Sequence, residues 1–331
     1  MKALRYILFP VPCSLILLLF LYACTKQEVT LSPEEEARAD SLALRVGVMP
    51  VLNCLPAYYA DSLGLFDDEG VIVKLLPYTA QMDIDTALTA RRAHVAYSDL
   101  IRALRLSGGQ TPVRAFLTTD EPLSLITVKG RRVNKIHQLR ERMIAISRLC
   151  ITDYWCEQFI DSNDVARPDF YRPQVHDVRL RTDMLRTGLM DAAILPEPYT
   201  SWMLATGNIQ LAETPAQGAS LAAWVFIDSL QADTFRMNQV GRFVRACRRA
   251  TEMINQGERA DVVRAILSRK CRVTPEALDS IRLPQIAPAR KPSPKDVDVA
   301  AQWLRTKKRL PKQARPDSLI YELHTDRQSH D

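Results

Sequence analysis

The chain has 331 residues and a formal charge of +6 at pH 7, with 25% charged and 47% hydrophobic side chains. After a short N-terminal stretch, enough chain remains for two lobes of ordinary domain size. Many basic residues lie in the C-terminal third, in RFVRACRR and TKKRL, without interleaved aromatic residues or a Gly-rich basic motif. We therefore expect a solvated helix face there and no nucleic-acid partner.

The N-terminus has the features of a lipoprotein signal peptide. Lys2 and Arg5 form a basic start, residues 15–21 are apolar, and the segment LYAC that ends at Cys24 reads as a lipobox. The apolar run is too short for a stable membrane span. We predict a signal peptide over residues 1–23 and lipid on Cys24, which would anchor a periplasmic body to the cell envelope. The alternative is a plain membrane anchor with an incidental cysteine.

A tether is expected over residues 24–44, because this stretch is polar, and we predict one short helical piece within it. Five further cysteines follow it: Cys54, Cys150, Cys156, Cys247 and Cys271. An odd number cannot all pair internally, and their spacing shows neither CxxC nor a Cys/His metal pattern. We predict no metal site and no cofactor. A Cys54–Cys150 disulfide is conceivable but disfavoured.

Strands and helices alternate from Arg45. The first unit contains a strand at 45–49, a helix from Pro56 to Gly64, a strand at 71–78, a helix at 82–92 and a strand at 94–99. Proline suits a first helical turn and glycine suits the C-terminal end. Asp83 or Asp85 could cap the second helix. This order predicts a parallel sheet with right-handed crossovers.

A second unit repeats this order at an offset of 98 residues. It contains a strand at 143–147, a helix at 151–162, an extended run at 170–175, a helix at 177–188 and a strand at 191–198. We predict an α/β fold of two similar lobes with mixed, mainly parallel sheets, joined by hinge strands and followed by a helical C-terminal region. Lobe I is expected to comprise residues 45–127 and 225–331, and lobe II residues 128–224.

The segment RVGVMPVLNCLPAYYADSLGLFDDEGVIVKLLPY resembles the opening of solute-binding proteins of the thiamine-precursor, sulfonate and nitrate type. Its Gly64-Leu65-Phe66 and Glu69-Gly70 elements carry this resemblance, together with DTALTARRAHVAYSDL and DMLRTGLMDAAILPEPY. The resemblance spans residues 45–229. It implies a type II periplasmic-binding-protein fold and delivery of a small ligand to an ABC permease and its ATPase. We expect no enzymatic activity. We expect a monomer.

The carboxyl ends of parallel strands form ligand sites in α/β lobes, so polar residues there are site candidates. The candidates are Asn53, Cys54, Tyr59, Gln81, Asp83, Ser98, Asp99, Thr118, Arg148, Thr152, Tyr154, Glu197 and Tyr199. Several have structural alternatives. Asn53 could form a turn, Cys54 could pack in the core, and Asp83 and Asp153 could cap helices. Only one of the adjacent Tyr58 and Tyr59 can face a cleft.

Arg148 is the one cationic side chain expected at these strand ends, against four acids. This balance and the nearby aromatic residues favour an uncharged or cationic heteroaromatic ligand such as a pyrimidine. Two other functions stay open: an enzyme of the pyrimidine-forming type, and a ligand-sensing lipoprotein. The enzymatic branch of the family uses His and Cys chemistry, and no two of the five histidines here lie at helical ligand spacing.

Overall fold

The computed structural model describes residues 32–162 and 170–323. Residues 1–42 and 43–331 form two separate units, and α2 (Pro33–Leu42) is the helix of the first. This helix matches the helical piece predicted in the tether. The predicted signal peptide and lipid site, Cys24, lie outside the described residues. Across the described ranges, every helix is too short or too polar to span a membrane.

Lobe I is built on a five-stranded sheet in the order β2-β1-β3-β9-β4. Its strands are β1 (Leu44–Val48), β2 (Val73–Pro77), β3 (Val95–Asp99), β4 (Val113–Thr119) and β9 (Ala222–Ile227). β1 runs parallel to β2 and β3, whereas β9 runs antiparallel to β3 and β4. All residues of β3 and β9 are buried, as expected for central strands covered on both faces.

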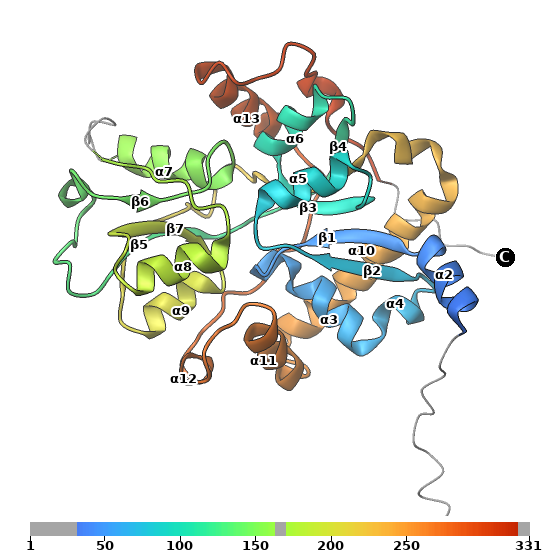
Figure 1. Cartoon of the computed structure of the whole chain (residues 1–331), viewed down its shortest axis with the longest axis horizontal. Helices are drawn as coiled ribbons and strands as arrows, with labels where there is room; N and C mark the ends of the chain where they lie inside the picture. Colours follow the sequence, from blue (N-terminus) through green and yellow to red (C-terminus); the bar gives the residue numbers. More distant parts are fainter. Residues whose placement is uncertain (1–31, 163–169, 324–331) are drawn as a thin grey trace, which may run out of the picture. The chain divides into compact units, whose positions relative to one another are not determined.

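Helices cover both faces of this sheet, with α5 and α6 above it and α3 and α4 below it in Figure 1. They are α3 (Leu55–Leu63), α4 (Leu65–Asp68), α5 (Gln81–Thr89), α6 (Leu100–Ser107) and α10 (Thr234–Asn255). Gly64 ends α3 with φ of 72°, a left-handed conformation that glycine adopts without steric cost. Neither cap that we considered for α5 forms, since Ala80 is its N-cap and makes no side-chain bond. Asp85 pairs instead with Arg102.

Lobe II contains a four-stranded sheet in the order β6-β7-β5-β8. The strands are β5 (Leu123–Thr127), β6 (Ile144–Ala145), β7 (Ala192–Pro196) and β8 (Ile209–Glu213), and the helices are α7 (Ile151–Asp161), α8 (Val178–Arg186) and α9 (Tyr199–Ala205). β6, α7, α8 and β7 follow the order of β1, α3, α5 and β3, so the predicted architectural repeat is present. The expected strand at 170–175 forms only isolated bridges to Met143 and Ile146.

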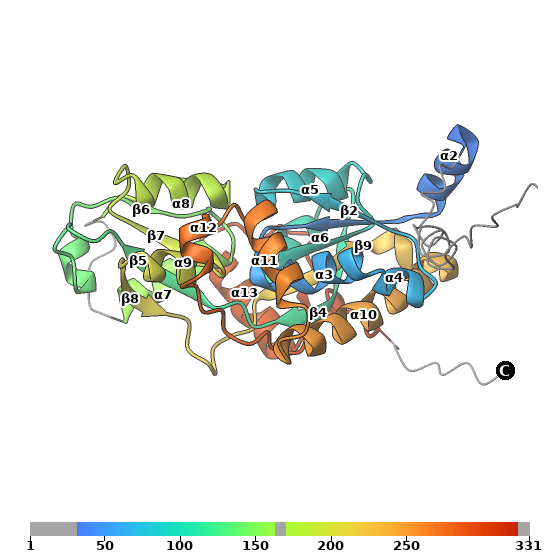
Figure 2. The same ribbon diagram turned by 90° about the horizontal axis from the view of Figure 1, so that it is seen from below.

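The chain passes between the sheets twice, at residues 120–122 and 214–221. These positions differ from our expected boundaries. β5 belongs to the second sheet although we assigned residues 123–127 to lobe I, and β9 joins the first sheet from Ala222 rather than residue 225. The difference arises because an extended run does not reveal which sheet it will join. The two-lobed α/β fold itself is confirmed (Figures 1 and 2).

The C-terminal region is helical as expected. It adds α11 (Ala260–Arg269), α12 (Pro275–Leu278) and α13 (Pro294–Thr306). α11 packs on α3, and α13 packs on α6, so this region covers lobe I. It also reaches lobe II, because α12 contacts α9.

Candidate functional site

The ends of the central strands meet between the two lobes, and the lobes already touch there. The amide of Leu52 donates to the Glu197 carbonyl at 2.9 Å, and the amide of Val178 donates to the Thr79 carbonyl at 3.0 Å. Thr79 Oγ1 also donates to the Asp177 carboxylate. The described lobes are therefore in direct contact along their facing edges, which is a closed arrangement.

Two cavities lie beside the crossover residues 120–122. The larger has a volume of about 290 Å³ and is lined by residues that include Asn53, Glu121, Trp155, Glu213 and Gln285. The smaller has a volume of about 40 Å³ and is lined from both lobes, by Gln81, Tyr97, Ser147, Thr152, His176 and Arg181 among others. Glu121 and Ile151 border both cavities. Together these spaces form the candidate site.

A chain of hydrogen bonds runs to Glu121 from lobe I. Asn53 Nδ2 donates to the Tyr97 hydroxyl at 3.1 Å, and this hydroxyl donates to Glu121 Oε2 at 2.7 Å. Burial raises the pKa of Glu121 to about 7, and the negative charge of Asp99 adds to this rise. Near neutral pH this carboxyl can therefore either accept or donate a hydrogen bond, a useful property in a ligand pocket.

Arg181 supplies positive charge to the smaller cavity. Its side chain is 3% exposed, its Nη1 donates to the Val175 carbonyl at 2.9 Å, and its Nε has no partner. No carboxylate of the described residues forms an ion pair with it, and burial lowers its pKa. Gln81 Oε1, on the opposite lobe, is likewise buried without a partner. Such unsatisfied groups at a cavity indicate a place for a ligand.

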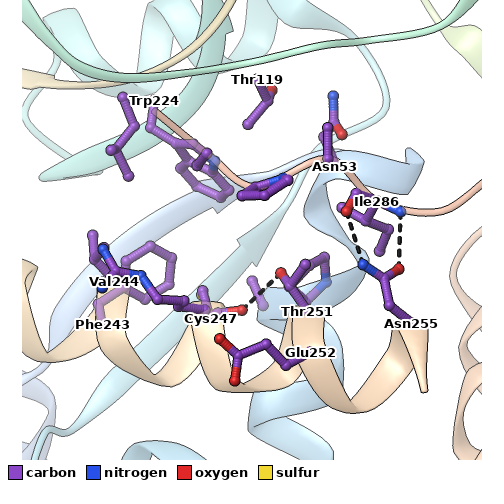
Figure 3. Close-up of a pocket in the computed structure, with 17 residues that line it drawn as sticks. Asn53, Thr119, Trp224, Phe243, Val244, Cys247, Thr251, Glu252, Asn255 and Ile286 are labelled. Atoms are coloured by element: carbon purple, nitrogen blue, oxygen red, sulfur yellow. Dashed lines mark hydrogen bonds between the residues drawn. The ribbon is translucent and has the colours of Figure 1, made fainter. Parts of the chain in front are cut away.

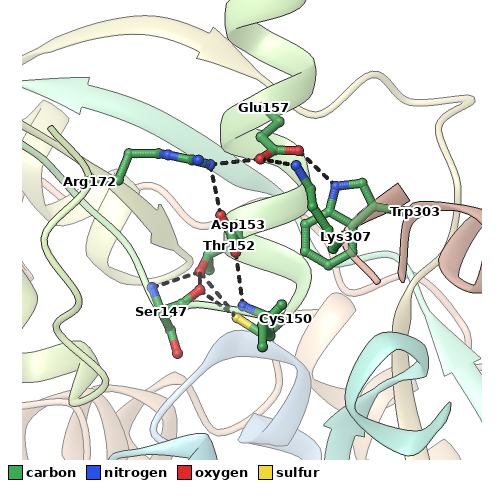
Figure 4. Close-up of polar contacts among 9 residues, drawn as sticks. Ser147, Cys150, Thr152, Asp153, Glu157, Arg172, Trp303 and Lys307 are labelled. Atoms are coloured by element: carbon green, nitrogen blue, oxygen red, sulfur yellow. Dashed lines mark hydrogen bonds and ion pairs between the residues drawn. The ribbon is translucent and has the colours of Figure 1, made fainter. Parts of the chain in front are cut away.

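The start of α7 is held by local polar contacts, shown in Figure 4. Thr152 Oγ1 accepts from the Ser147 amide and donates to the Ser147 carbonyl, both at 3.0 Å. Ser147 Oγ lies 2.8 Å from His176 Nδ1. Desolvation lowers the pKa of His176, which keeps the imidazole neutral near neutral pH. This edge of the cavity therefore offers neutral hydrogen-bonding groups.

The other end of α7 is attached to the C-terminal region. Glu157 accepts from Trp303 Nε1 at 2.9 Å and from Lys307 Nζ at 2.6 Å, and also from Arg172 at 2.8 Å (Figure 4). Trp303 lies on α13, which packs on α6 of lobe I. Glu157 thus connects lobe II to a helix of lobe I.

Three of the predicted site residues line the two cavities: Asn53, Gln81 and Thr152. Cys54 and Tyr59 are buried in the core, where Cys54 Sγ accepts from the Met49 amide and Tyr59 donates to the Glu258 carbonyl. Neither Tyr59 nor Tyr58 lines the cavities, because α3 turns both rings into the core of lobe I.

Other candidates lie near the cavities without lining them. Ser98 is buried, whereas Asp83 and Arg148 are exposed. Thr118 bonds to Arg290. The ring of Tyr154 packs on Trp155 and Trp303, and that of Tyr199 packs on Trp202. Cys150, not Asp153, is the N-cap residue of α7. Asp153 lies in the first turn of the helix, where its carboxylate accepts from the Leu149 amide and from Arg172.

Asp99 and Glu197 end equivalent strands, as expected, but their carboxylates serve helix starts. Asp99 Oδ1 accepts from the Arg102 amide at 2.8 Å, and its Oδ2 accepts across the cleft from the Ile151 amide at 3.4 Å. Glu197 Oε2 accepts from the Ser201 amide at 3.1 Å. Burial raises the pKa of each carboxyl to about 6.

Sequence reasoning missed Glu121, Tyr97, Trp155, His176 and Arg181 as site residues. Glu121 lies two residues after β4, so its place just beyond a strand end was an available signal. Arg181 sits within RLRTD, where helical spacing gives no sign that one arginine is buried. The predicted candidates Asp99 and Glu197 do lie at strand ends, but their carboxylates bond to amides in the first turns of the helices that follow.

The described residues contain no group of three or more His, Cys, Asp or Glu side chains that could hold a metal ion. The five cysteines downstream of Cys24 are free, so the disfavoured Cys54–Cys150 disulfide is absent from the structure.

Comparison with solved structures identifies the fold. An alkanesulfonate-binding protein from Xanthomonas axonopodis, bound to MOPS, is 14% identical over 85% of this chain and 98% of its own, with a TM-score of 0.69. A periplasmic nitrate-binding protein from Synechocystis is 14% identical over 72% of this chain and 69% of its own, with a TM-score of 0.62. A Candida albicans protein with the generic periplasmic-binding-protein fold is 13% identical over 85% and 97%, with a TM-score of 0.61.

No curated protein sequence matches the chain. A family model does, over residues 52–257, which is more than half of the chain and includes β2 to β9 with most of the candidate site; its description is NMT1/THI5 like. The chain has the periplasmic-binding-protein fold and belongs to the NMT1/THI5-like family.

Proposed function

We propose that this protein is the solute-binding component of an ABC importer. It captures a small ligand between its lobes and presents it to a permease and its ATPase. The observation that carries this proposal is the pair of cavities between the lobes, bordered by a carboxyl of raised pKa and by a buried arginine that has no counter-ion among the described residues. The sulfonate- and nitrate-binding proteins of the same fold support it by analogy.

The ligand that we propose is a heteroaromatic molecule of pyrimidine size. The larger cavity, about 290 Å³, can hold a ring, and Trp155 gives it a flat apolar wall. Glu121 borders both cavities and can accept from an amino group or donate to a ring nitrogen, whereas Arg181 lines only the smaller cavity and can donate to a carbonyl substituent that enters it. The smaller cavity, about 40 Å³, holds only a few water-sized groups, so a substituent rather than a ring would enter it.

Closure of the lobes would then report binding. Ligand contacts to Glu121 and Arg181 exist together only when the lobes meet, so the ligand stabilises the closed state through its higher affinity for it. The permease would recognise that closed surface. Lipid on Cys24 would keep the protein at the membrane where the permease lies.

Native mass spectrometry of gently purified protein tests the ligand class by detecting a retained small molecule. Calorimetry with a pyrimidine, an alkanesulfonate and nitrate follows. We expect pyrimidine binding that Glu121→Gln weakens, since glutamine cannot ionise. The matched control, Glu276→Gln, changes an exposed carboxylate that lines neither interlobe cavity and should leave affinity within about twofold. Tight binding of the sulfonate or nitrate with no response to pyrimidines would overturn the ligand class.

The tether has its own test. Cys24→Ser should move the protein from the detergent phase to the aqueous phase in a phase-separation assay, because its lipid attachment atom is gone. An unchanged distribution would remove the lipid from the proposal and leave the binding function intact.

A further inference from the structure

A further cavity lies within lobe I and adjoins the larger interlobe cavity, with which it shares Asn53 and Ala287. Its volume is about 200 Å³, and α10, the ends of β4 and β9, the start of α3 and the segment 286–289 form its walls (Figure 3). Asn255 fixes that segment with two hydrogen bonds of 2.9 Å, one to the Ile286 carbonyl and one from its amide. The cavity is therefore a built feature of the fold with anchored walls.

The buried part of its lining is largely apolar and carries no charged side chain. The rings of Trp224 and Phe243 meet edge to face with centroids 5.4 Å apart. The charged residues of the lining, Arg248 and Glu252, are exposed on α10. Burying a charged molecule against the apolar inner wall would leave its charge without a partner at high cost. The walls therefore select an uncharged ligand.

The volume of the cavity and one polar atom in its wall further restrict which ligands can bind. An engineered cavity of about 150 Å³ in another protein holds benzene, so about 200 Å³ accommodates one ring with a small substituent. Thr119 lines the cavity, is 4% exposed, and its Oγ1 has no hydrogen-bond partner in the described part of the chain. A hydroxyl or amine on the ligand could satisfy this atom.

We propose that this cavity is a second ligand site, for an uncharged single-ring molecule that carries one hydrogen-bonding substituent. The site neighbours the larger interlobe cavity, but Trp224 and Phe243 line only this cavity, so its aromatic wall is not part of the candidate site.

An occupant would also touch the residues that hold the crossover. Thr119 directly precedes it, and Asn53, which lines this cavity too, donates to the Asp120 carbonyl at 3.3 Å and to the Tyr97 hydroxyl. Ligand in the second site therefore restrains the segment on which lobe movement depends. This link to the cleft rests on the proposed function, whereas binding at the second site does not.

The experiment uses phenol and toluene, which carry a hydroxyl group and a methyl group respectively on the same ring, with affinities measured by ligand-observed NMR. Phenol should bind the wild-type protein about fivefold more tightly than toluene, the factor expected for one hydrogen bond. Thr119→Val should abolish this preference. Cys247→Phe, which fills the cavity from α10, should weaken both probes at least about tenfold by overpacking the ligand space. Arg249→Phe places the same ring on an exposed position of α10 that does not line the cavity and should change neither affinity.

Cys247 gives an independent readout, because it is a free cysteine that lines the cavity and is partly exposed as a residue. Phenol should slow maleimide labelling of Cys247, mapped by mass spectrometry, and should slow amide exchange at residues 119–121. Both effects should vanish in Ala289→Phe, a second cavity-filling variant. Absence of phenol binding to the wild type, or binding that neither filling variant weakens, would overturn the site. Unchanged exchange at residues 119–121 despite binding would overturn the link to the crossover. Neither result depends on the importer ligand.

Discussion

At the scale of single residues, two buried arginines of similar exposure have opposite surroundings. Arg102 is 2% exposed and pairs with Asp85, whereas Arg181 is 3% exposed and has no carboxylate partner among the described residues. Removing a charge from water without a partner costs several kcal/mol. The fold therefore retains Arg181 at a cost that a bound ligand can offset.

Replacing Arg181 with Met tests this idea. We expect ligand affinity to fall at least about tenfold while the free energy of unfolding stays constant or rises, because an uncompensated charge leaves the interior. Arg102→Met is the matched control and should lower the free energy of unfolding by about 3–5 kcal/mol, since it leaves Asp85 without its ion-pair partner. Urea unfolding and calorimetry measure both quantities. A stability loss in Arg181→Met as large as the control's would contradict a ligand-binding role.

Glu121 should make stability depend on pH. Its folded-state pKa of about 7 exceeds that of an ordinary glutamate, so the folded protein binds this proton more tightly than the unfolded chain. Its stabilising contribution is complete at low pH and is lost as pH rises through about 7. In the wild type, this group should lower the free energy of unfolding by up to about 1.4 kcal/mol per pH unit between roughly pH 4.5 and 7. Glu121→Gln should remove that pH dependence.

The comparison between wild type and Glu121→Gln isolates this group. Asp99 and Glu197 have pKa values raised to about 6, so their contributions to stability are also lost as pH rises. His94 has a pKa lowered to about 4, so its contribution changes with pH in the opposite direction. All three remain in both proteins. Parallel pH profiles from urea unfolding would show that Glu121 does not titrate in this window.

At the scale of elements, α13 joins the lobes. It packs on α6, and its Trp303 and the following Lys307 bond to Glu157 of α7. Trp303 is a neutral donor and Lys307 a charged donor, and both bond to one buried carboxylate. This link is stronger than an exposed ion pair. α13 therefore acts as a latch that opposes separation of α7 from lobe I.

Lys307→Met should weaken this latch. We expect faster amide exchange in α7 and α13 and a loss of about 1.5–3 kcal/mol in the free energy of unfolding, the range for a hydrogen bond to a charged group. Arg305→Met removes an exposed cation from the end of the same helix and should have little effect on either quantity. Equal exchange in the two variants would exclude the latch.

How far the sequence predicts these elements depends on local signals. Gly64 and Gly188 mark helix ends because glycine tolerates positive φ, and both occupy that conformation. α6 follows β3 without an intervening loop, with Asp99 as its cap, so the sequence offers no turn to announce it. The site residues depend on which sheet β5 joins and on which face of α8 is buried. Both depend on contacts between residues far apart in the sequence, which a local sequence pattern does not specify.

At the scale of the whole body, residues 43–331, lobe separation should control ligand release. Ala80 and Asp177 form an antiparallel bridge across the cleft, and such partners have Cα atoms about 4.5–5.5 Å apart, within reach of a disulfide. Ala80→Cys with Asp177→Cys should therefore lock the lobes when oxidised. We expect slower ligand release by at least about tenfold than in the reduced form of the same protein, measured by stopped-flow. Equal rates would show that ligand leaves without lobe separation.

The two passages between the sheets also determine the order in which the polypeptide can fold. All of lobe II, residues 123–213, is inserted between β4 and β9, and β9 occupies the position between β3 and β4 in the first sheet. The N-terminal strands are therefore synthesised long before the strand that pairs with both of them. Until residues 222–227 arrive, β3 and β4 have unpaired edges that can associate with other chains. Rapid folding of the inserted lobe would bring its two ends together and shorten that exposed interval.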